Sequence, residues 1–287
     1  MLFSRLKKSL KFRIENKLDQ WFLIFSFEGK FEQKSLKNFQ KIIPPKDRFW
    51  ADPFIVFKDN IHYIFFEEYI FEKNKGHIAY FTIDKNRKIG KPIKILEQSF
   101  HLSYPFIFEY ENKLYMIPET QEKKSIQLYK CTNFPEKWEY QKNILTDIDA
   151  VDSTIFQYEN KWWMFTTIRK NETEGWNDLH IYYTNNPIEG EWVSHSMNPI
   201  SNKNNNMRSA GEIFLEDNKI YRPSQMSSDD EYGKGIIINK IKILNEKNYE
   251  EEAIKTIESW DSSIKGIHTL NHKNNLSILD AKWKIKK

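Results

Sequence analysis

The sequence of 287 residues carries a formal net charge of +4, with 29% charged and 39% hydrophobic residues. This balance fits a soluble globular protein that is long enough to bury a sizeable core. Lysines are scattered over the chain, and no lysine/arginine block is interleaved with aromatic residues, so we expect no nucleic-acid partner. Aromatic residues reach 15% and glycines number only 9, which favours aromatic-rich strands over a glycine-looped nucleotide fold.

The first residues, 1–20, are interpreted as a basic leader ahead of a single domain at residues 21–287. Residues 3–18 are predicted to be helical. They could contact a membrane surface peripherally, and a solvated helix is the plainer alternative. The apolar stretch at 21–27 is too short for a bilayer, which takes about 20 residues, and no signal-peptide cleavage pattern follows it. The single cysteine, Cys131, cannot form an internal disulfide. We therefore expect a cytoplasmic protein without a membrane span.

A unit of roughly fifty residues recurs along the chain. Each copy has an apolar strand, a polar turn containing asparagine, and an aromatic strand, as in Pro53–Phe57, Asp59–Asn60 and Tyr63. The aromatic strand of the unit is marked in successive copies by Tyr63, Tyr115, Trp163, Tyr221 and, in a weaker copy, Ser277. The spacing is that of a four-stranded propeller blade, ~40–50 residues. The sequence thus predicts an all-β, five-bladed β-propeller with a short N-terminal helical leader, closed by a strand at 21–27.

The innermost strands of a propeller converge on its axis, so equivalent positions in the copies should face one another. The first such position is occupied by Asp52, Tyr104, Asp152, Ala210 and Gly266. Two residues further, on the same side of a regular strand, stand Phe54, Phe106, Thr154, Glu212 and His268. Several carboxylates are therefore expected at one end of the channel. They suggest glycosidic chemistry, in which one carboxylic acid protonates the leaving oxygen and one carboxylate activates water or attacks.

Each of these polar residues also has a purely structural interpretation. Asp52 precedes a proline and could open a turn, and Asp152 could form an Asx turn. Glu212 could pair with a nearby arginine, and His268 could be a core histidine with satisfied hydrogen bonds. The shared register across the copies favours a joint site.

Several motifs resemble glycoside hydrolase family 43 and its relatives, including family 32. The resemblance rests on Ala51–Val56, Val151–Phe156, Ser209–Phe214 and Gly266–His268. A closer resemblance links Phe49–Phe54, Phe66–Tyr69 and Lys75–Ile78 to another group. That group is the β-propeller domain at the N-terminus of glucosamine inositolphosphorylceramide transferases and in free-standing bacterial proteins. This resemblance covers roughly residues 45–283 and implies a five-bladed propeller with carbohydrate-related work.

The hydrolases imply catalytic roles for three residues of this chain. Asp52 would be the general base, Asp152 would tune the pKa of the acid, and Glu212 would be the acid. Glu212 stands two positions past the slot of the hydrolase acid, and Glu119 or Glu67, which share a slot on the second strand, are substitutes. The residues expected to contact the substrate are Trp50, Tyr104, Glu119, Arg208 and His268.

The sequence therefore predicts a carbohydrate-active protein that acts on a glycosidic bond, by hydrolysis or transfer, in intracellular glycan or glycolipid metabolism. The alternative is a non-catalytic propeller that binds a glycan or serves a glycosyltransferase as a scaffold, and a third possibility is a protein-interaction propeller. The expected partner is a saccharide or glycoconjugate, without a cofactor. No ligand spacing demands a metal, although a cation beside His268 would suit the channel.

Overall fold

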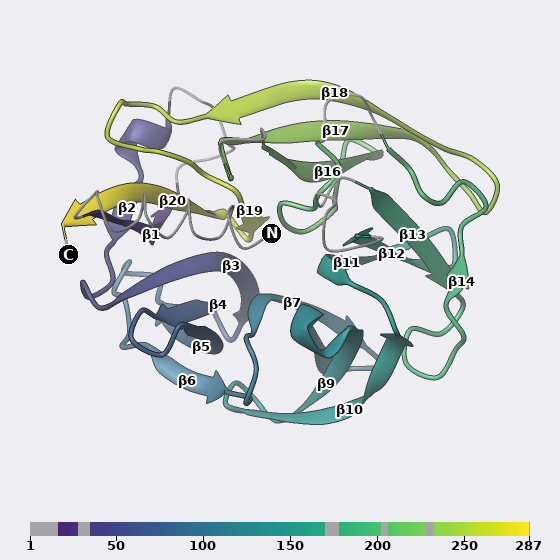
Figure 1. Cartoon of the computed structure of the whole chain (residues 1–287), viewed down its shortest axis with the longest axis horizontal. Coiled ribbons are helices and arrows are strands. Elements are labelled where there is room, and N and C mark those ends of the chain that lie inside the picture. The colour runs from purple at the N-terminus through teal and green to yellow at the C-terminus, as the bar shows by residue number, and fades with distance from the viewer. Residues whose placement is uncertain (1–16, 28–34, 170–177, 202–205, 228–231, 287) are drawn as a thin grey trace, which may run out of the picture.

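The computed structural model describes these parts of the chain: residues 17–27, 35–169, 178–201, 206–227 and 232–286. They form five antiparallel sheets of four strands each, set around a central axis (Figure 1). The predicted all-β, five-bladed propeller is confirmed. The leader helix predicted at 3–18 lies outside the described residues, except for its last two positions, which are extended and begin the first strand.

The first four blades follow one another along the chain. Blade 1 contains β3 (Arg48–Lys58), β4 (Ile61–Ile70), β5 (Lys75–Ile83) and β6 (Ile93–Leu96). Blade 2 contains β7 (Ser103–Tyr110), β8 (Lys113–Glu119), β9 (Ser125–Asn133) and β10 (Lys137–Thr146), with the 3-10 helix η2 (Gln121–Lys123). Blade 3 contains β11 (Ala150–Tyr158), β12 (Lys161–Ile168), β13 (Leu179–Thr184) and β14 (Val193–Ser194). Blade 4 contains β15 (Phe214–Glu216), β16 (Lys219–Met226), β17 (Gly235–Leu244) and β18 (Tyr249–Glu258).

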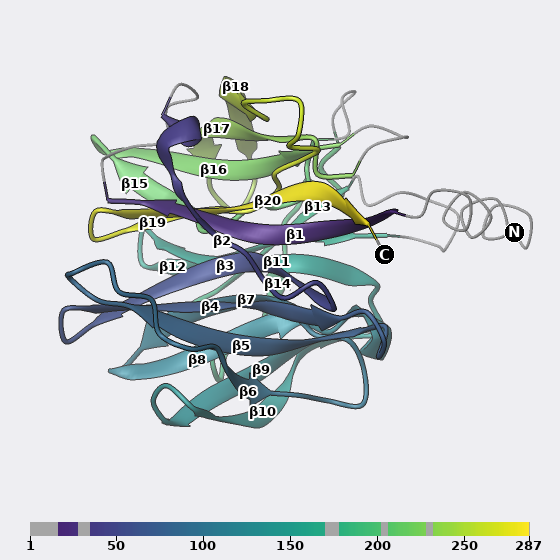
Figure 2. The same ribbon diagram turned by 90° about the vertical axis from the view of Figure 1, so that its left-hand side faces the viewer.

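Blade 5 joins the two ends of the chain and closes the ring. It contains β19 (Leu270–Lys273), β20 (Leu276–Lys286), β1 (Lys17–Ser26) and β2 (Gln40–Ile42), with the 3-10 helix η1 (Leu36–Asn38) before β2. β1 pairs with β20 in unbroken register, from Lys17 opposite Lys286 to Ser26 opposite Ser277, and the two run side by side in Figure 2. The predicted closing strand at 21–27 is therefore confirmed, and it starts earlier, at Lys17.

The polar turn of the repeat has the same backbone in every blade. Both turn residues have positive φ, between 47° and 66°, at these five dipeptides: Asp59–Asn60, Glu111–Asn112, Glu159–Asn160, Asp217–Asn218 and Asn274–Asn275. A two-residue hairpin with positive φ at both positions matches the twist of the strands it joins, and asparagine and aspartate tolerate that conformation better than most residues. The turn chemistry therefore sets the register of the two innermost strands of each blade.

The innermost strands of blades 1 to 3 share an irregularity near their first residues. Asp52, Tyr104 and Asp152 all have positive φ, at 52°, 43° and 52°. In each blade the pairing register with the next strand shifts at this point. Such β-bulges re-aim side chains. Three of the five positions predicted to be equivalent therefore share one conformation, whereas Ala210 and Gly266 do not have positive φ.

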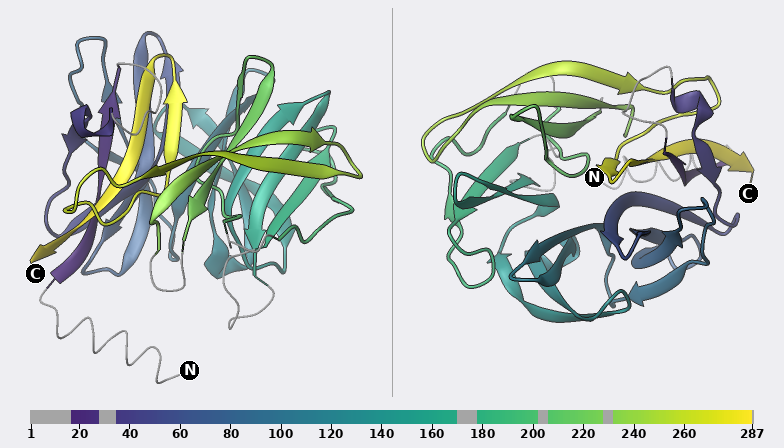
Figure 3. Two further views of the ribbon diagram at one scale, coloured as in Figure 1. Left: turned by 90° about the horizontal axis from the view of Figure 1, so that it is seen from above. Right: turned by 180° about the vertical axis from the view of Figure 1, so that it is seen from behind.

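Hydrophobic side chains fill the spaces between neighbouring blades. One cluster joins Phe54, Phe106 and Ala150, which come from the innermost strands of blades 1, 2 and 3. Fully burying a large apolar side chain stabilises the fold by roughly 1.5–3 kcal/mol, so these clusters hold the blades together. The arrangement of the blades around the axis is also seen from behind in Figure 3. Within the described ranges, no helix is both long and apolar enough to cross a membrane.

Candidate functional site

Asp52 lies at the bulge of β3 and is almost completely buried, with 5% of its surface exposed. Its Oδ1 accepts a hydrogen bond of 2.7 Å from the hydroxyl of Thr269, and its Oδ2 accepts one of 3.3 Å from the backbone N–H of Tyr104. Burial raises the pKa of Asp52 to about 6; nearby His268 opposes this rise, and the carboxylates of Asp152 and Asp280 add to it. Asp52 thus titrates close to neutral pH.

His268 and Asp280 support Asp52 from blade 5. Asp280, on β20, is fully buried and accepts hydrogen bonds from the backbone N–H groups of Asp52, His268 and Thr269 at 2.9–3.0 Å. The Nδ1 of His268 lies 2.6 Å from Asp280 Oδ2, and its Nε2 lies 3.4 Å from Asp52 Oδ1. Trp21 stacks on the imidazole at 4.1 Å between ring centroids. Burial lowers the pKa of His268, but the two carboxylates outweigh burial and raise it.

Three of these groups could in principle hold a metal ion. One ligand atom from each of Asp52, His268 and Asp280 lies within 4.8 Å of the others. Their donor atoms are already engaged, however. Asp280 receives three backbone hydrogen bonds, and Asp52 receives the Thr269 hydroxyl and the N–H of Tyr104. These contacts orient both carboxylates, so the three residues form a hydrogen-bonded network in this structure.

Asp152 is held by Arg208 in a two-pronged ion pair. Arg208 Nε contacts Asp152 Oδ2, and Arg208 Nη2 lies 3.3 Å from Asp152 Oδ1. The Nε2 of Gln225 donates a further hydrogen bond of 2.9 Å to Asp152. Arg208 also lies 3.7 Å from Glu119 Oε2. Because bidentate Arg–carboxylate pairs are strong and directional, Arg208 fixes Asp152 and neutralises part of the local charge.

Glu67 and Glu119 complete the cluster from the second strands of blades 1 and 2. Glu67 pairs with Ala51 and Glu119 with Ser103, which are equivalent register positions. Burial raises the pKa of both carboxyls well above the ordinary range; Asp52 raises that of Glu67 further, and Asp152 that of Glu119. Arg208 opposes the rise at Glu119. Both residues therefore favour the neutral carboxylic acid.

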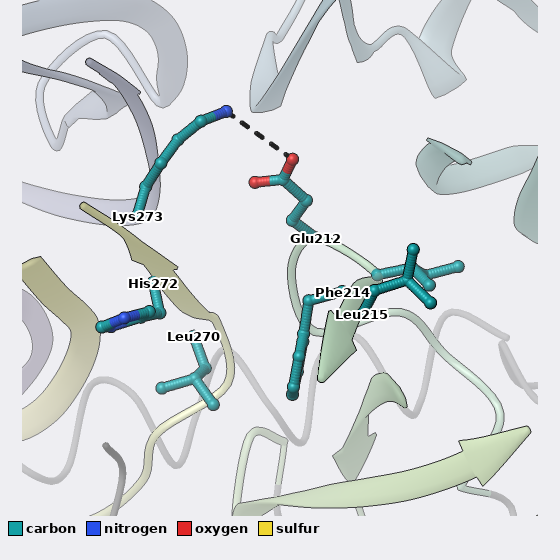
Figure 4. Close-up of a pocket in the computed structure, with 7 residues that line it drawn as sticks. Glu212, Phe214, Leu215, Leu270, His272 and Lys273 are labelled. Carbon is teal, nitrogen blue, oxygen red and sulfur yellow. Dashed lines mark ion pairs between the residues drawn. The ribbon is translucent and has the colours of Figure 1, made fainter. Parts of the chain in front are cut away.

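Glu212 lies elsewhere, in a cavity of about 250 Å³ that is also lined by Phe214, Leu215, Leu270, His272 and Lys273 (Figure 4). Its carboxylate faces the Nζ of Lys273 at 3.8 Å, and its backbone N–H donates to Asn271 at 2.7 Å. Burial raises the pKa of Glu212, and Lys273 lowers it. The prediction for Ala210 and Glu212 requires a regular strand, in which residues two apart point to the same side. Gly211 between them has a φ of +130°, so the strand is not regular there and Glu212 does not join the cluster.

The remaining predicted contact residues are mostly internal. The indole of Trp50 donates 2.9 Å to Glu68 and packs on Phe66. Tyr104 is fully buried, and its hydroxyl accepts the N–H of Gly211 at 2.9 Å and lies 3.0 Å from Thr154 Oγ1. Tyr104 therefore supports Asp52 from within the core, whereas Trp50 packs inside blade 1. Arg208, Glu119 and His268, by contrast, belong to the cluster itself.

The sequence interpretation did not single out Asp280, Thr269, Gln225 or Tyr232, whose ring lies 5.3 Å from the imidazole of His268. Asp280 is a lone carboxylate within the apolar run Leu276–Ala281, and that isolation was the available signal. Gln225 and Tyr232 lie on and after β16, outside the repeat positions, and no pattern distinguishes them.

Comparison with known proteins gives structures of the same fold and a family that matches most of this chain. Residues 40–283 match the family described as the N-terminal part of glucosamine inositolphosphorylceramide transferase 1. The proteins of that name from Oryza sativa subsp. japonica and Arabidopsis thaliana are each 35% identical, over 225 and 233 residues. These alignments cover 74% and 78% of this chain but 30% and 29% of the plant proteins. The chain therefore spans under a third of those relatives.

Solved structures share the fold at low identity. The catalytic domain of a GH62 α-L-arabinofuranosidase from Coprinopsis cinerea superposes with a TM-score of 0.58 at 12% identity, covering 81% of this chain and 90% of that domain. An arabinanase from Bacillus subtilis superposes with a TM-score of 0.58 at 11% identity, and the superposition covers 82% of this chain and 96% of the arabinanase. At such identities the likeness shows the propeller fold alone.

Proposed function

The chain belongs to the family of the N-terminal part of glucosamine inositolphosphorylceramide transferase 1, and we propose that it acts on a glycosidic bond, by hydrolysis or glycosyl transfer. Family and fold support a carbohydrate-related function. The finer proposal rests on one observation, the convergence of Asp52, Asp152, Glu67 and Glu119 into one electrostatically linked cluster at the axis. The substrate is a saccharide or glycoconjugate.

The environments of these carboxyls differ, and this difference assigns the role of the base to one carboxyl and that of the acid to another. Asp52, with a pKa of about 6, is mostly ionised at neutral pH and serves as the general base. Glu119, held neutral beside Asp152, serves as the acid. As the glycosidic C–O bond breaks, Glu119 gives its proton to the leaving oxygen. Asp52 takes the proton of the water, or of the acceptor hydroxyl, whose oxygen forms the new bond to the anomeric carbon.

Arg208 and Asp152 keep the acid in its working state. Asp152 raises the pKa of Glu119, whereas Arg208 lowers it. The pKa of the acid therefore depends on the balance between these two neighbours. Asp152 is 2% exposed and bound on both oxygens, which leaves it to tune the acid rather than to attack. Glu67, 3.4 Å from the Nε2 of His101, is the second candidate for the acid.

Substitution of the two proposed groups tests this assignment. Wild type, Asp52→Asn, Glu119→Gln and Glu212→Gln are assayed against a panel of aryl glycosides and nucleotide sugars. Loss of a general acid or base costs roughly 10²–10⁴-fold in rate, so we expect that loss for Asp52→Asn and Glu119→Gln. Unchanged turnover in Asp52→Asn would remove Asp52 as the base. Loss in Glu212→Gln with full activity in Glu119→Gln would return the acid role to Glu212.

A second candidate function is glycan binding without catalysis. It is favoured by the ion pairs of Arg208 with both Asp152 and Glu119 and by the low exposure of Asp52 and Asp152, 5% and 2%. In this case the cluster is a recognition surface, and the propeller serves a glycosyltransferase as a binding module. Saccharide binding to wild type without turnover of any substrate in the panel would support this candidate.

A further inference from the structure

Tyr232 occupies a distinctive place beside the carboxylate cluster. It lies in the connection between β16 and β17, and 43% of its surface is exposed. Its ring lies 5.3 Å from the imidazole of His268 and 6.3 Å from the indole of Trp21, edge-on in both cases. The guanidinium carbon of Arg208 lies 5.2 Å from the same ring. Tyr232 is thus the half-exposed member of a group that is otherwise mostly buried.

The contacts of Tyr232 connect the two halves of the cluster. His268 lies 3.4 Å from Asp52, and Arg208 pairs with Asp152. The tyrosine ring therefore spans the gap between the two aspartates predicted from the repeat.

The backbone holds Tyr232 in this position through blade 5. The Nζ of Lys282 donates a hydrogen bond of 2.9 Å to the carbonyl of Tyr232. The N–H of Ile267 donates one of 2.8 Å to the carbonyl of Gly233. Gly233 has a φ of +67°, and a Cβ there would lie 2.8 Å from the Trp21 ring. A Cβ on Gly266 would lie 2.3 Å from the carbonyl oxygen of Gly233. Both glycines are needed for this close approach, so the placement of Tyr232 is built into the fold.

We propose that Tyr232 covers the axial carboxylates and forms the ligand-contacting wall of the site. A ligand that reaches Asp52 and Glu119 packs against this ring. A tyrosine face offers apolar area beside a polar hydroxyl, which suits a sugar ring that presents C–H groups on one side and hydroxyls on the other. The identity of the ligand as a saccharide rests on the proposed function, whereas the covering role rests on the contacts of Tyr232 alone.

Carboxyl labelling tests the cover without any ligand. Carbodiimide-driven coupling of glycine ethyl ester is followed by peptide mass spectrometry for wild type, Tyr232→Ala, Tyr232→Phe and Tyr140→Ala. Tyr140, on β10 of blade 2, is a matched control because it is a 50% exposed tyrosine. We expect several-fold faster labelling of Asp52 and Glu119 in Tyr232→Ala alone. Unchanged labelling would overturn the proposal, as would an equal increase at the fully buried Asp280, which would indicate unfolding.

Binding tests the contact with a sugar. Glucosamine, N-acetylglucosamine and arabinose are titrated by ligand-observed NMR against the Asp52→Asn protein, with and without Tyr232→Ala or Tyr140→Ala. Loss of an aromatic contact should weaken binding roughly 2- to 10-fold with Tyr232→Ala only. Equal affinity in the presence and absence of Tyr232 would overturn the contact. If the parent binds none of the sugars, the saccharide assignment and the proposed function fall, and the labelling result still decides the cover.

Discussion

The axial cluster and the cavity around Glu212 both contain carboxylates, but they surround them differently. At the axis, the buried Asp52 and Asp152 lie near the partly buried Glu119, and Asp152 and Glu119 share the cation of Arg208. In the cavity, Glu212 is 34% exposed and faces Lys273, which is 42% exposed. Burial beside like charges raises the pKa of a carboxyl, as at Asp52 and Glu119, whereas the interaction within a solvated ion pair is strongly screened. The neighbours of a carboxylate, more than its place in the repeat, therefore decide its chemistry.

The largest expected effect comes from removing the cation shared at the axis. Arg208→Ala leaves Asp152 buried without its ion-pair partner, and losing one partner of a buried pair costs about 3–5 kcal/mol. We expect a loss of that size in the free energy of unfolding, measured with denaturant at pH 7. The matched change, Arg169→Ala, breaks a partly exposed pair with Asp149 and should cost less. Equal losses of unfolding free energy in the two variants would show that the axial ion pair stabilises the fold no more than the pair of Arg169 with Asp149.

The pH dependence of stability is expected to be the next largest effect. The pKa of Asp52 rises from 3.8 to about 6 on folding, so its stabilising contribution is present below pH 4 and is lost as the pH rises through 6. The loss is roughly 3 kcal/mol at 1.36 kcal/mol per pKa unit. The raised pKa of His268 acts in the same direction. Denaturant unfolding from pH 4 to 8 should show falling stability, with the contribution of Asp52 concentrated between pH 4 and 6, and Asp52→Asn should flatten that part of the slope. A rise with pH would contradict the cluster as described.

A smaller effect is expected from the hydroxyl that Thr269 donates to Asp52. Thr269→Val keeps the shape of the side chain but removes the 2.7 Å hydrogen bond, which costs about 1–3 kcal/mol when a buried acceptor loses its donor. The same change should raise the pKa of Asp52, because this bond favours the ionised form. The readouts are the unfolding free energy and the pH at which the Asp52 carboxyl titrates by NMR. An unchanged titration would show that Thr269 does not set the charge of Asp52.

The smallest effect is expected in the cavity around Glu212. Lys273→Met removes the partner of Glu212, but pairs this exposed contribute only about 0–1 kcal/mol. Thermal unfolding of Lys273→Met should therefore stay close to that of wild type, and the titration of Asp52 should not move. A shift in that titration would mean that the two carboxylate regions are coupled.

The fold could be predicted because its causes are local and repeated. The two-residue turns with Asn, such as Asp59–Asn60, recur in every blade and fix the strand register. The equivalence of Asp52 and Asp152 followed from the same register. The position of Glu212 did not follow, because alternation holds only within a regular strand and β15 begins at Phe214, after Gly211.

Other parts of the site depend on tertiary contacts that leave no periodic trace. Asp280 reaches the axis from the second strand of blade 5, where its role is to accept backbone N–H groups of the neighbouring strand ends. Tyr232 depends on the close approach of two backbones at Gly233 and Gly266. Such contacts arise only once blades from distant parts of the chain are assembled, so a single sequence gives little indication of them.

The pairing of β1 with β20 also has a consequence for how the chain acquires its structure. The strands that must meet lie about as far apart in sequence as this chain allows, from Lys17 to Lys286. Closing so long a loop has an entropic cost, and folds rich in distant pairings reach the native state slowly. During synthesis, blades 1 to 4 can form in turn, but β1 has no β20 to pair with until Leu276–Lys286 has been translated. Until then the ring stays open, with an unpaired strand edge that is available to other chains.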